Sequence, residues 1–142
     1  MGISPDGKGV GVVAGGGWAD LERKRHYSVP LYNTEDMKSQ LGEMETGAYP
    51  CAMTTHPVLP LMFACNGKQG AIYNAKSFVA GQKFNAPREA PGAAAASVLA
   101  FVGKGKKLAW GASSGDAGVL KIYELELTKE QQEEVTKAFS AK

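Results

Sequence analysis

The chain has 142 residues, of which 44% are hydrophobic and 21% are charged, and its formal net charge at pH 7 is +2. This composition is typical of one globular domain, and so small a net charge argues against direct binding to nucleic acid. The sequence shows neither an apolar run of membrane-spanning length, about 18 residues, nor the signature of a secretory signal at its start. We therefore expect an intracellular protein, cytoplasmic or nuclear, and the 18 glycines favour short strands joined by tight turns.

The first expected unit covers residues 1–45. Its turn is Ser4-Pro5-Asp6-Gly7-Lys8, after which Val10, Val12 and Val13 predict a β-branched strand. Only three residues precede Ser4, so the strand that should come before the turn is expected to be missing. Trp18 to Arg25 is expected to be a loop with a helical turn.

The rest of this unit should form two more strands. Residues 26–32 alternate as a strand. Residues 34–45 are ambiguous, because three apolar residues keep helical spacing while Gly42 and the repeat plan favour an outer strand. We interpret the segment as a strand.

The second unit, residues 46–92, contains the clearest hairpin. Leu61–Cys65 and Ala71–Tyr73 are apolar runs, and the polar, glycine-bearing segment 66–70 between them supplies turn residues. One strand should precede this hairpin, and residues 78–84 should follow as an outer strand. Residues 85–92, with two prolines and a glycine, predict a loop.

The third unit, residues 93–127, repeats this order. An inner strand is expected at 97–101, a turn at 102–106, and an alternating strand at 119–127. In the tail, residues 128–142, Thr128 and Gln131 form a capping box, which predicts a helix from Lys129 to Phe139.

The three units end alike, in an aliphatic residue, a tyrosine and a short polar or acidic residue. The tyrosines are Tyr32, Tyr73 and Tyr123, separated by 41 and 50 residues. Self-similarity at about 40 residues is the mark of propellers and solenoids. Together with the Ser4-Pro5-Asp6-Gly7 turn, this ordered recurrence resembles the WD-repeat β-propellers, and in particular the C-terminal part of such a protein. Tyrosine stands where the tryptophan of the Trp-Asp pair would be.

The resemblance implies an all-β fold of partial or assembled β-propeller blades, built from antiparallel strands, with a short C-terminal helix. It also implies a non-catalytic protein-interaction scaffold that is a subunit of a larger assembly. Propellers close with four to eight blades, so three blades leave two apolar faces open. The expected partners are therefore other proteins or the remaining propeller blades, without a cofactor.

Two loops supply candidate interaction residues. Trp18, Arg23, Lys24 and Arg25 lie together in the first long loop, and Arg88 lies in the second. Tryptophan and arginine are the residue types that dominate binding hot spots. The alternative interpretation is that these loops are solvated insertions.

One motif points to a different function. Gly111-Ala-Ser113-Ser-Gly115 matches the nucleophile elbow of hydrolases, but a strand rather than a helix is expected after it, and both histidines precede it. Cys51 and Cys65 have no companions at metal-ligand spacing and predict buried free thiols, so we expect no metal site. The alternative to a scaffold is a small self-closed β-domain that binds a small ligand or acts as a hydrolase through Ser113.

Overall fold

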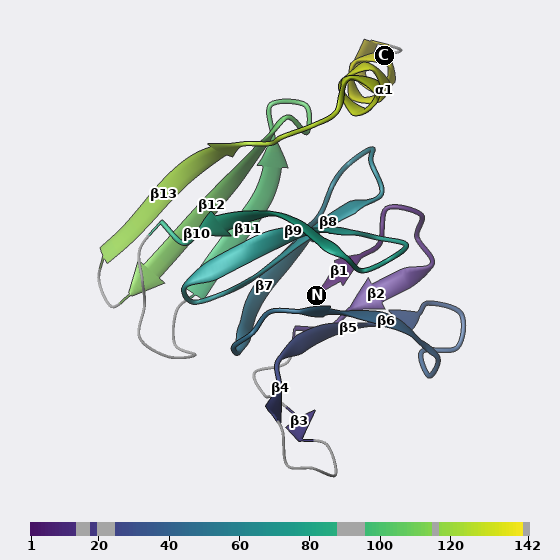
Figure 1. Ribbon diagram of the computed structural model, residues 1–142, viewed down its shortest axis with the longest axis vertical. Coiled ribbons are helices and arrows are strands. Elements are labelled where there is room, and N and C mark those ends of the chain that lie inside the picture. Colours follow the sequence, from purple (N-terminus) through teal and green to yellow (C-terminus); the bar gives the residue numbers. More distant parts are fainter. Residues whose placement is uncertain (14–17, 20–24, 88–95, 115–116, 141–142) are drawn as a thin grey trace.

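The fold consists of three antiparallel sheets followed by a short helix (Figure 1). The computed structural model describes residues 1–13, 18–19, 25–87, 96–114 and 117–140. The first sheet has the order β1-β2-β5-β6, with β1 (Gly2–Ile3), β2 (Gly9–Gly11), β5 (Ser28–Asn33) and β6 (Gln40–Glu45). The second has the order β7-β8-β9-β10, with β7 (Pro50–Thr55), β8 (Leu61–Asn66), β9 (Gln69–Asn74) and β10 (Ala80–Asn85). The third has the order β11-β12-β13, with β11 (Ala96–Val102), β12 (Lys107–Ser114) and β13 (Ala117–Glu124).

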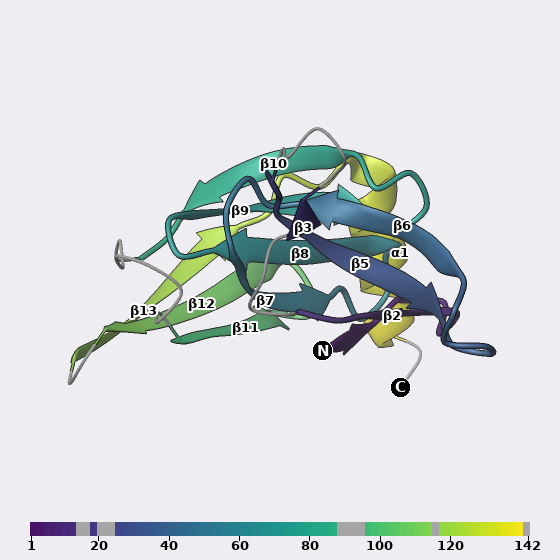
Figure 2. The same ribbon diagram turned by 90° about the horizontal axis from the view of Figure 1, so that it is seen from below.

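The first strands of the three sheets lie next to one another. Strand β7 contacts both β1 and β11, so the sheets are arranged like neighbouring blades around a common inner edge. Figure 2 shows β7 and β11 near one edge of the molecule and β10 at the opposite edge. The prediction of an all-β fold of antiparallel, blade-like sheets with a short helix at the end is confirmed. Each sheet lies within one of the segments 1–45, 46–92 and 93–127.

The turns between first and second strands form where the sequence placed them. In the first sheet, Gly7 has φ 74° and the Ser4 hydroxyl accepts a hydrogen bond from the Gly9 amide, 2.8 Å. In the third sheet, Gly103, Lys104 and Gly105 all have positive φ. Glycine adopts this conformation without steric cost, so the glycines determine where the chain reverses.

The first unit differs from its prediction in two places. No strand was expected before Ser4, but a short strand of two residues, β1, precedes it. Strand β2 ends at Gly11, and Val12 and Val13 lie outside it. The two ends of the predicted loop, β3 (Trp18–Ala19) and β4 (Arg25–His26), pair as an antiparallel ribbon, and the helical turn expected between them falls on residues 20–24, outside the described residues.

Two hydrophobic clusters hold the sheets together. The first joins the first two sheets; its buried members are Val29, Leu31, Met44, Met53, Met62, Ala64, Ala71 and Tyr73. The second joins the second and third sheets; its buried members are Phe63, Cys65, Ile72, Phe84, Leu108 and Trp110. Strands β8 and β9 supply residues to both clusters from their opposite faces, because successive side chains of a strand alternate.

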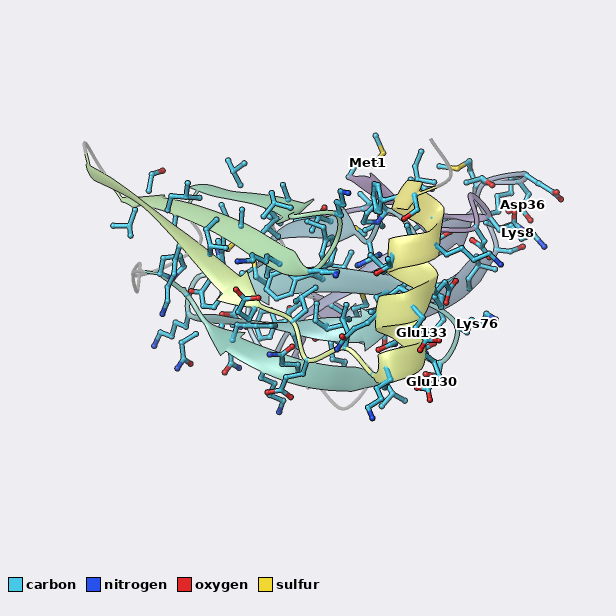
Figure 3. All side chains as sticks on the ribbon, turned by 90° about the horizontal axis from the view of Figure 1, so that it is seen from above. Met1, Lys8, Asp36, Lys76, Glu130 and Glu133 are labelled. Atoms are coloured by element: carbon cyan, nitrogen blue, oxygen red, sulfur yellow. The ribbon has the colours of Figure 1, made fainter. Side chains whose placement is uncertain are left out.

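Helix α1 (Lys129–Ser140) begins at the predicted capping box. The Gln131 amide donates to the Thr128 hydroxyl, 3.3 Å, and the Thr128 amide donates to Gln131 Oε1, 3.0 Å. Val135 is buried, whereas Glu130 and Glu133 are exposed on the helix surface, as Figure 3 shows from above. Lys8, Asp36 and Lys76, labelled in the same view, belong to the turns between strands. Among the residues that the structure describes, no helix has the length and apolar character required to span a lipid bilayer.

Candidate functional site

The predicted interaction residues of the first long loop fall partly within the β3–β4 ribbon. Trp18 pairs with His26, and Ala19 pairs with Arg25, so the backbones of Trp18 and Arg25 belong to the same ribbon. Arg23, Lys24 and Arg88 lie outside the described residues. A role of these five residues in binding stays a prediction.

Ser113 lies in the middle of a sheet. It is on β12, where it pairs with Ala96 of β11 and Gly118 of β13. The next described element after it is strand β13, as expected from the sequence, so the strand-to-helix turn of a nucleophile elbow does not form here.

His56 connects the second and third sheets as a structural residue. Its Nδ1 accepts hydrogen bonds from the amides of Val58, 3.1 Å, and Leu59, 2.9 Å. Nε2 must therefore carry the proton, and it donates to the Gly105 carbonyl at 2.8 Å. The side chain is only 1% exposed, and its ring lies 4.9 Å from that of Phe101. Both nitrogens are thus occupied by the fold.

The neutral form of His56 makes stability depend on pH. Burial lowers the pKa of His56 from its ordinary 6.5, although the Gly105 carbonyl and the charge of Glu134 partly oppose this. The unfolded chain therefore binds the proton more readily, and stability should be lost as the pH falls from 6.5 towards the lowered pKa. We expect His56→Asn to reduce this pH dependence, because its amide oxygen can still accept the two turn amides while no ionisable group remains.

Urea unfolding between pH 5 and 7 measures this effect. His26→Asn, at the other histidine, is the control and should keep the slope. An unchanged slope in His56→Asn would show that His56 is not the group responsible.

The two cysteines are thiols of low reactivity. Cys65 is fully buried, and burial together with the neighbouring Cys51 raises its pKa to about 12. Burial also raises the pKa of Cys51, which is partly buried. Both are free, so the predicted buried thiols are confirmed for Cys65 and only in part for Cys51. Since the thiolate is the nucleophile and the metal ligand, neither is prepared for such chemistry. Within the described ranges, no group of three or more His, Cys, Asp or Glu residues could hold a metal ion.

A groove of about 500 Å³ lies between the first and second sheets. Glu43 and Glu45 of β6 and Lys83 of β10 give it charged walls, and Phe78 contributes an aromatic surface. The Tyr73 hydroxyl also lines the groove, where it donates to the Glu45 backbone carbonyl. The groove is therefore a hollow with a mixed polar and apolar lining, next to the contact that joins these two sheets.

The outer face of the third sheet exposes several large apolar side chains. The register places Val98, Gly111 and Leu120 in one row, and Ala100, Ala109 and Ile122 in the next. Val98 is 73% exposed, Leu120 69% and Ile122 49%. The neighbouring row is polar and contains the Lys107–Glu124 ion pair, 2.8 Å. We call these two apolar rows the third-sheet outer face.

The first sheet also has a face directed away from the second sheet. Directly paired residues share a face, and Ile3, Val10 and Tyr32 form such a row. Leu31, the neighbour of Tyr32, belongs to the cluster shared with the second sheet, so Tyr32 lies on the opposite side. Ile3 is 58% exposed and Tyr32 is half-buried. We call this row the first-sheet outer face.

The sequence did not identify either outer face by residue. The alternation in residues 119–127 was visible, but which of its two sides is covered depends on the neighbouring sheet.

Comparison with known proteins adds no relative. No model of a known protein family matches the chain. A search of curated proteins also finds no match. Membership of the WD-repeat family therefore stays a prediction that rests on the residues quoted above.

Proposed function

We propose that the chain is a non-catalytic protein-interaction scaffold, built from WD-repeat-like blades, that works as a subunit of a larger assembly. The observation that carries this proposal is the third-sheet outer face, where Val98, Leu120 and Ile122 present contiguous apolar surface to solvent. Contiguous exposed apolar surface bordered by polar residues usually marks a protein interface. The polar Lys107–Glu124 row supplies such a border.

The equivalent positions of the three tyrosines support the blade interpretation. Tyr32, Tyr73 and Tyr123 all lie on the third strand of their sheets, and their partners on the second strand are Val10, Met62 and Leu108. A blade-like sheet buries each of its faces against a neighbour, so a sheet at either end of such a row needs a partner. The partners we expect are other proteins or further blades of the same kind.

Association through the third-sheet outer face can be tested by sedimentation velocity and light scattering. We expect the wild-type protein to associate beyond its 15.0 kDa monomer mass as its concentration rises. The double variant Leu120→Lys/Ile122→Lys should remain monomeric, because charged side chains cannot be buried in an apolar contact without partners.

Val79→Lys is the matched control for this experiment. Val79 is 65% exposed, close to the exposure of Leu120, but it lies in the turn before β10 and away from the third sheet. It should associate like the wild type. A wild-type protein that stays a stable monomer at every concentration, indistinguishable from the double variant, would contradict the proposal.

A further inference from the structure

Two tyrosines connect successive sheets by the same hydrogen bond. The Tyr73 hydroxyl of β9 donates to the backbone carbonyl of Glu45. The Tyr123 hydroxyl of β13 donates to the backbone carbonyl of Asn85, 2.6 Å. Glu45 and Asn85 are the last residues of β6 and β10, the outer strands of the first and second sheets. Each tyrosine therefore binds the end of the outer strand of the preceding sheet.

Tyr32 is the third member of this series and has no acceptor of this kind. It occupies the same register position on β5, and its ring lies on the first-sheet outer face. Among the residues that the structure describes, none accepts a hydrogen bond from the Tyr32 hydroxyl. The Tyr32 hydroxyl is thus a hydrogen-bond donor on the first-sheet outer face, where a preceding sheet would lie.

We propose that the first-sheet outer face binds another antiparallel sheet, with the Tyr32 hydroxyl donating to the backbone carbonyl at the end of its outer strand. This inference rests on the proposed scaffold function and specifies one of its partners. Ile3, in the same row as Tyr32 and 58% exposed, provides the apolar part of the contact, whereas Val10 between them is already buried within the chain.

The partner sheet comes from outside the described residues. The carbonyls of Glu45 and Asn85 are already used by Tyr73 and Tyr123. At the end of β13, the Glu124 carbonyl accepts a hydrogen bond from Gln82, 3.2 Å. In a second copy of this chain, the carbonyls at the ends of β6, β10 and β13 would each already accept a side-chain hydrogen bond, which favours a sheet of different origin.

The contact can be tested by supplying such a sheet within the same chain. In an extended protein, a copy of residues 46–95 is placed before Met1, so that a copied β10 and its free Asn85 carbonyl precede the first sheet. The native link from β10 to β11, residues 86–95, then joins the copied β10 to β1. Urea unfolding of the original and extended proteins, each with and without Tyr32→Phe, measures the contribution of the hydroxyl.

In the extended protein, we expect Tyr32→Phe to raise the unfolding equilibrium constant about fivefold, the effect of removing one ordinary hydrogen bond. In the original protein, the same substitution should change it little. Tyr123→Phe is the matched control and should raise the constant about fivefold in both proteins, because its bond to Asn85 is present in each.

Hydrogen exchange shows whether the added sheet docks. Docking should slow the exchange of amides in β1, β2 and β5. An extended protein without this protection, or one in which Tyr32→Phe has no effect while Tyr123→Phe keeps its own, would overturn the proposal. An equal effect of Tyr32→Phe in the original protein would also overturn it, since the hydroxyl would then be used within the chain.

The remaining possible outcome of these measurements is self-association of the original protein. If the original protein forms dimers that Tyr32→Phe disrupts, the occupant is a second copy and the assignment of a different sheet is wrong. The scaffold function itself is tested at Leu120 and Ile122, on a different sheet, so failure of this contact can be told apart from failure of the scaffold function.

Discussion

Replacing Phe63 with alanine should lower the free energy of unfolding by about 3–5 kcal/mol, the usual cost of truncating a buried phenylalanine. Phe63 is fully buried on β8, in the cluster between the second and third sheets. Its ring contacts those of Phe84 and Trp110 edge to face, with centroids 5.7 and 5.4 Å apart. Gly70 of the adjacent strand lies against the ring and has no side chain that could fill the space.

Urea unfolding followed by tryptophan fluorescence measures this loss. Phe63→Leu is the control and should cost less, about 1–2 kcal/mol, because it keeps most of the buried volume. If the alanine variant is too unstable to purify while Phe63→Leu folds normally, the direction of the prediction holds. Equal stability of Phe63→Ala and wild type would mean that the second and third sheets are not packed as described.

Replacing Gly105 with alanine should lower the free energy of unfolding by about 2–5 kcal/mol. Gly105 has φ 80°, a conformation that costs a residue with a Cβ about 1–2 kcal/mol. An added Cβ would also lie 2.6 Å from the His56 ring, which must then move away from its hydrogen bond to the Gly105 carbonyl. Disrupting a buried hydrogen bond adds about 1–3 kcal/mol.

Gly103→Ala separates the two contributions. Gly103 also has positive φ, 59°, but the nearest atom to its added Cβ is a side-chain carbon of Lys107 at 3.5 Å. This variant should therefore show only the backbone cost. Thermal and urea unfolding of both variants measure the difference. Equal losses in the two variants would contradict the role assigned to the contact between Gly105 and His56.

Much of the fold could be predicted because the local sequence pattern and the packing against neighbouring sheets favour the same structure. Residues 61–73 form the predicted hairpin, with Phe63 paired to Ile72. Of the ambiguous segment 34–45, the second half becomes strand β6 and residues 34–39 form a turn. Met44 completes the cluster with the second sheet, and this burial outweighs the helical spacing. Packing between sheets decided the cases that local pattern left open.

The differences arise where the deciding interaction is distant in sequence. Strand β1 is too short to be recognised by alternation, and it forms by pairing with β2. On β13, Leu120 and Ile122 face outward while Lys121 pairs with Trp110 on the inner face, the reverse of the usual arrangement. Lys121 is accommodated there because its ammonium lies 4.9 Å from the centre of the Tyr123 ring.

The hydrogen bonds between the sheets likewise could not be predicted from the sequence. The spacing of Tyr32, Tyr73 and Tyr123 was visible in the sequence, but the acceptors of Tyr73 and Tyr123 are backbone carbonyls. Every residue has a carbonyl, so no residue type marks these acceptors. His56 likewise could be recognised as a turn residue, whereas its bond to Gly105 spans 49 positions of the chain.

The two hydrophobic clusters have no residue in common, and the second sheet contributes to both. Within the described part of the chain, the two clusters are therefore connected through the second sheet, where Phe63 and Ala64 are successive residues with opposite orientations. In such an arrangement, a displacement passes from the first sheet to the second and from the second to the third. A partner bound to one outer sheet would displace the other only to the extent that β8 and β9 move as a rigid unit.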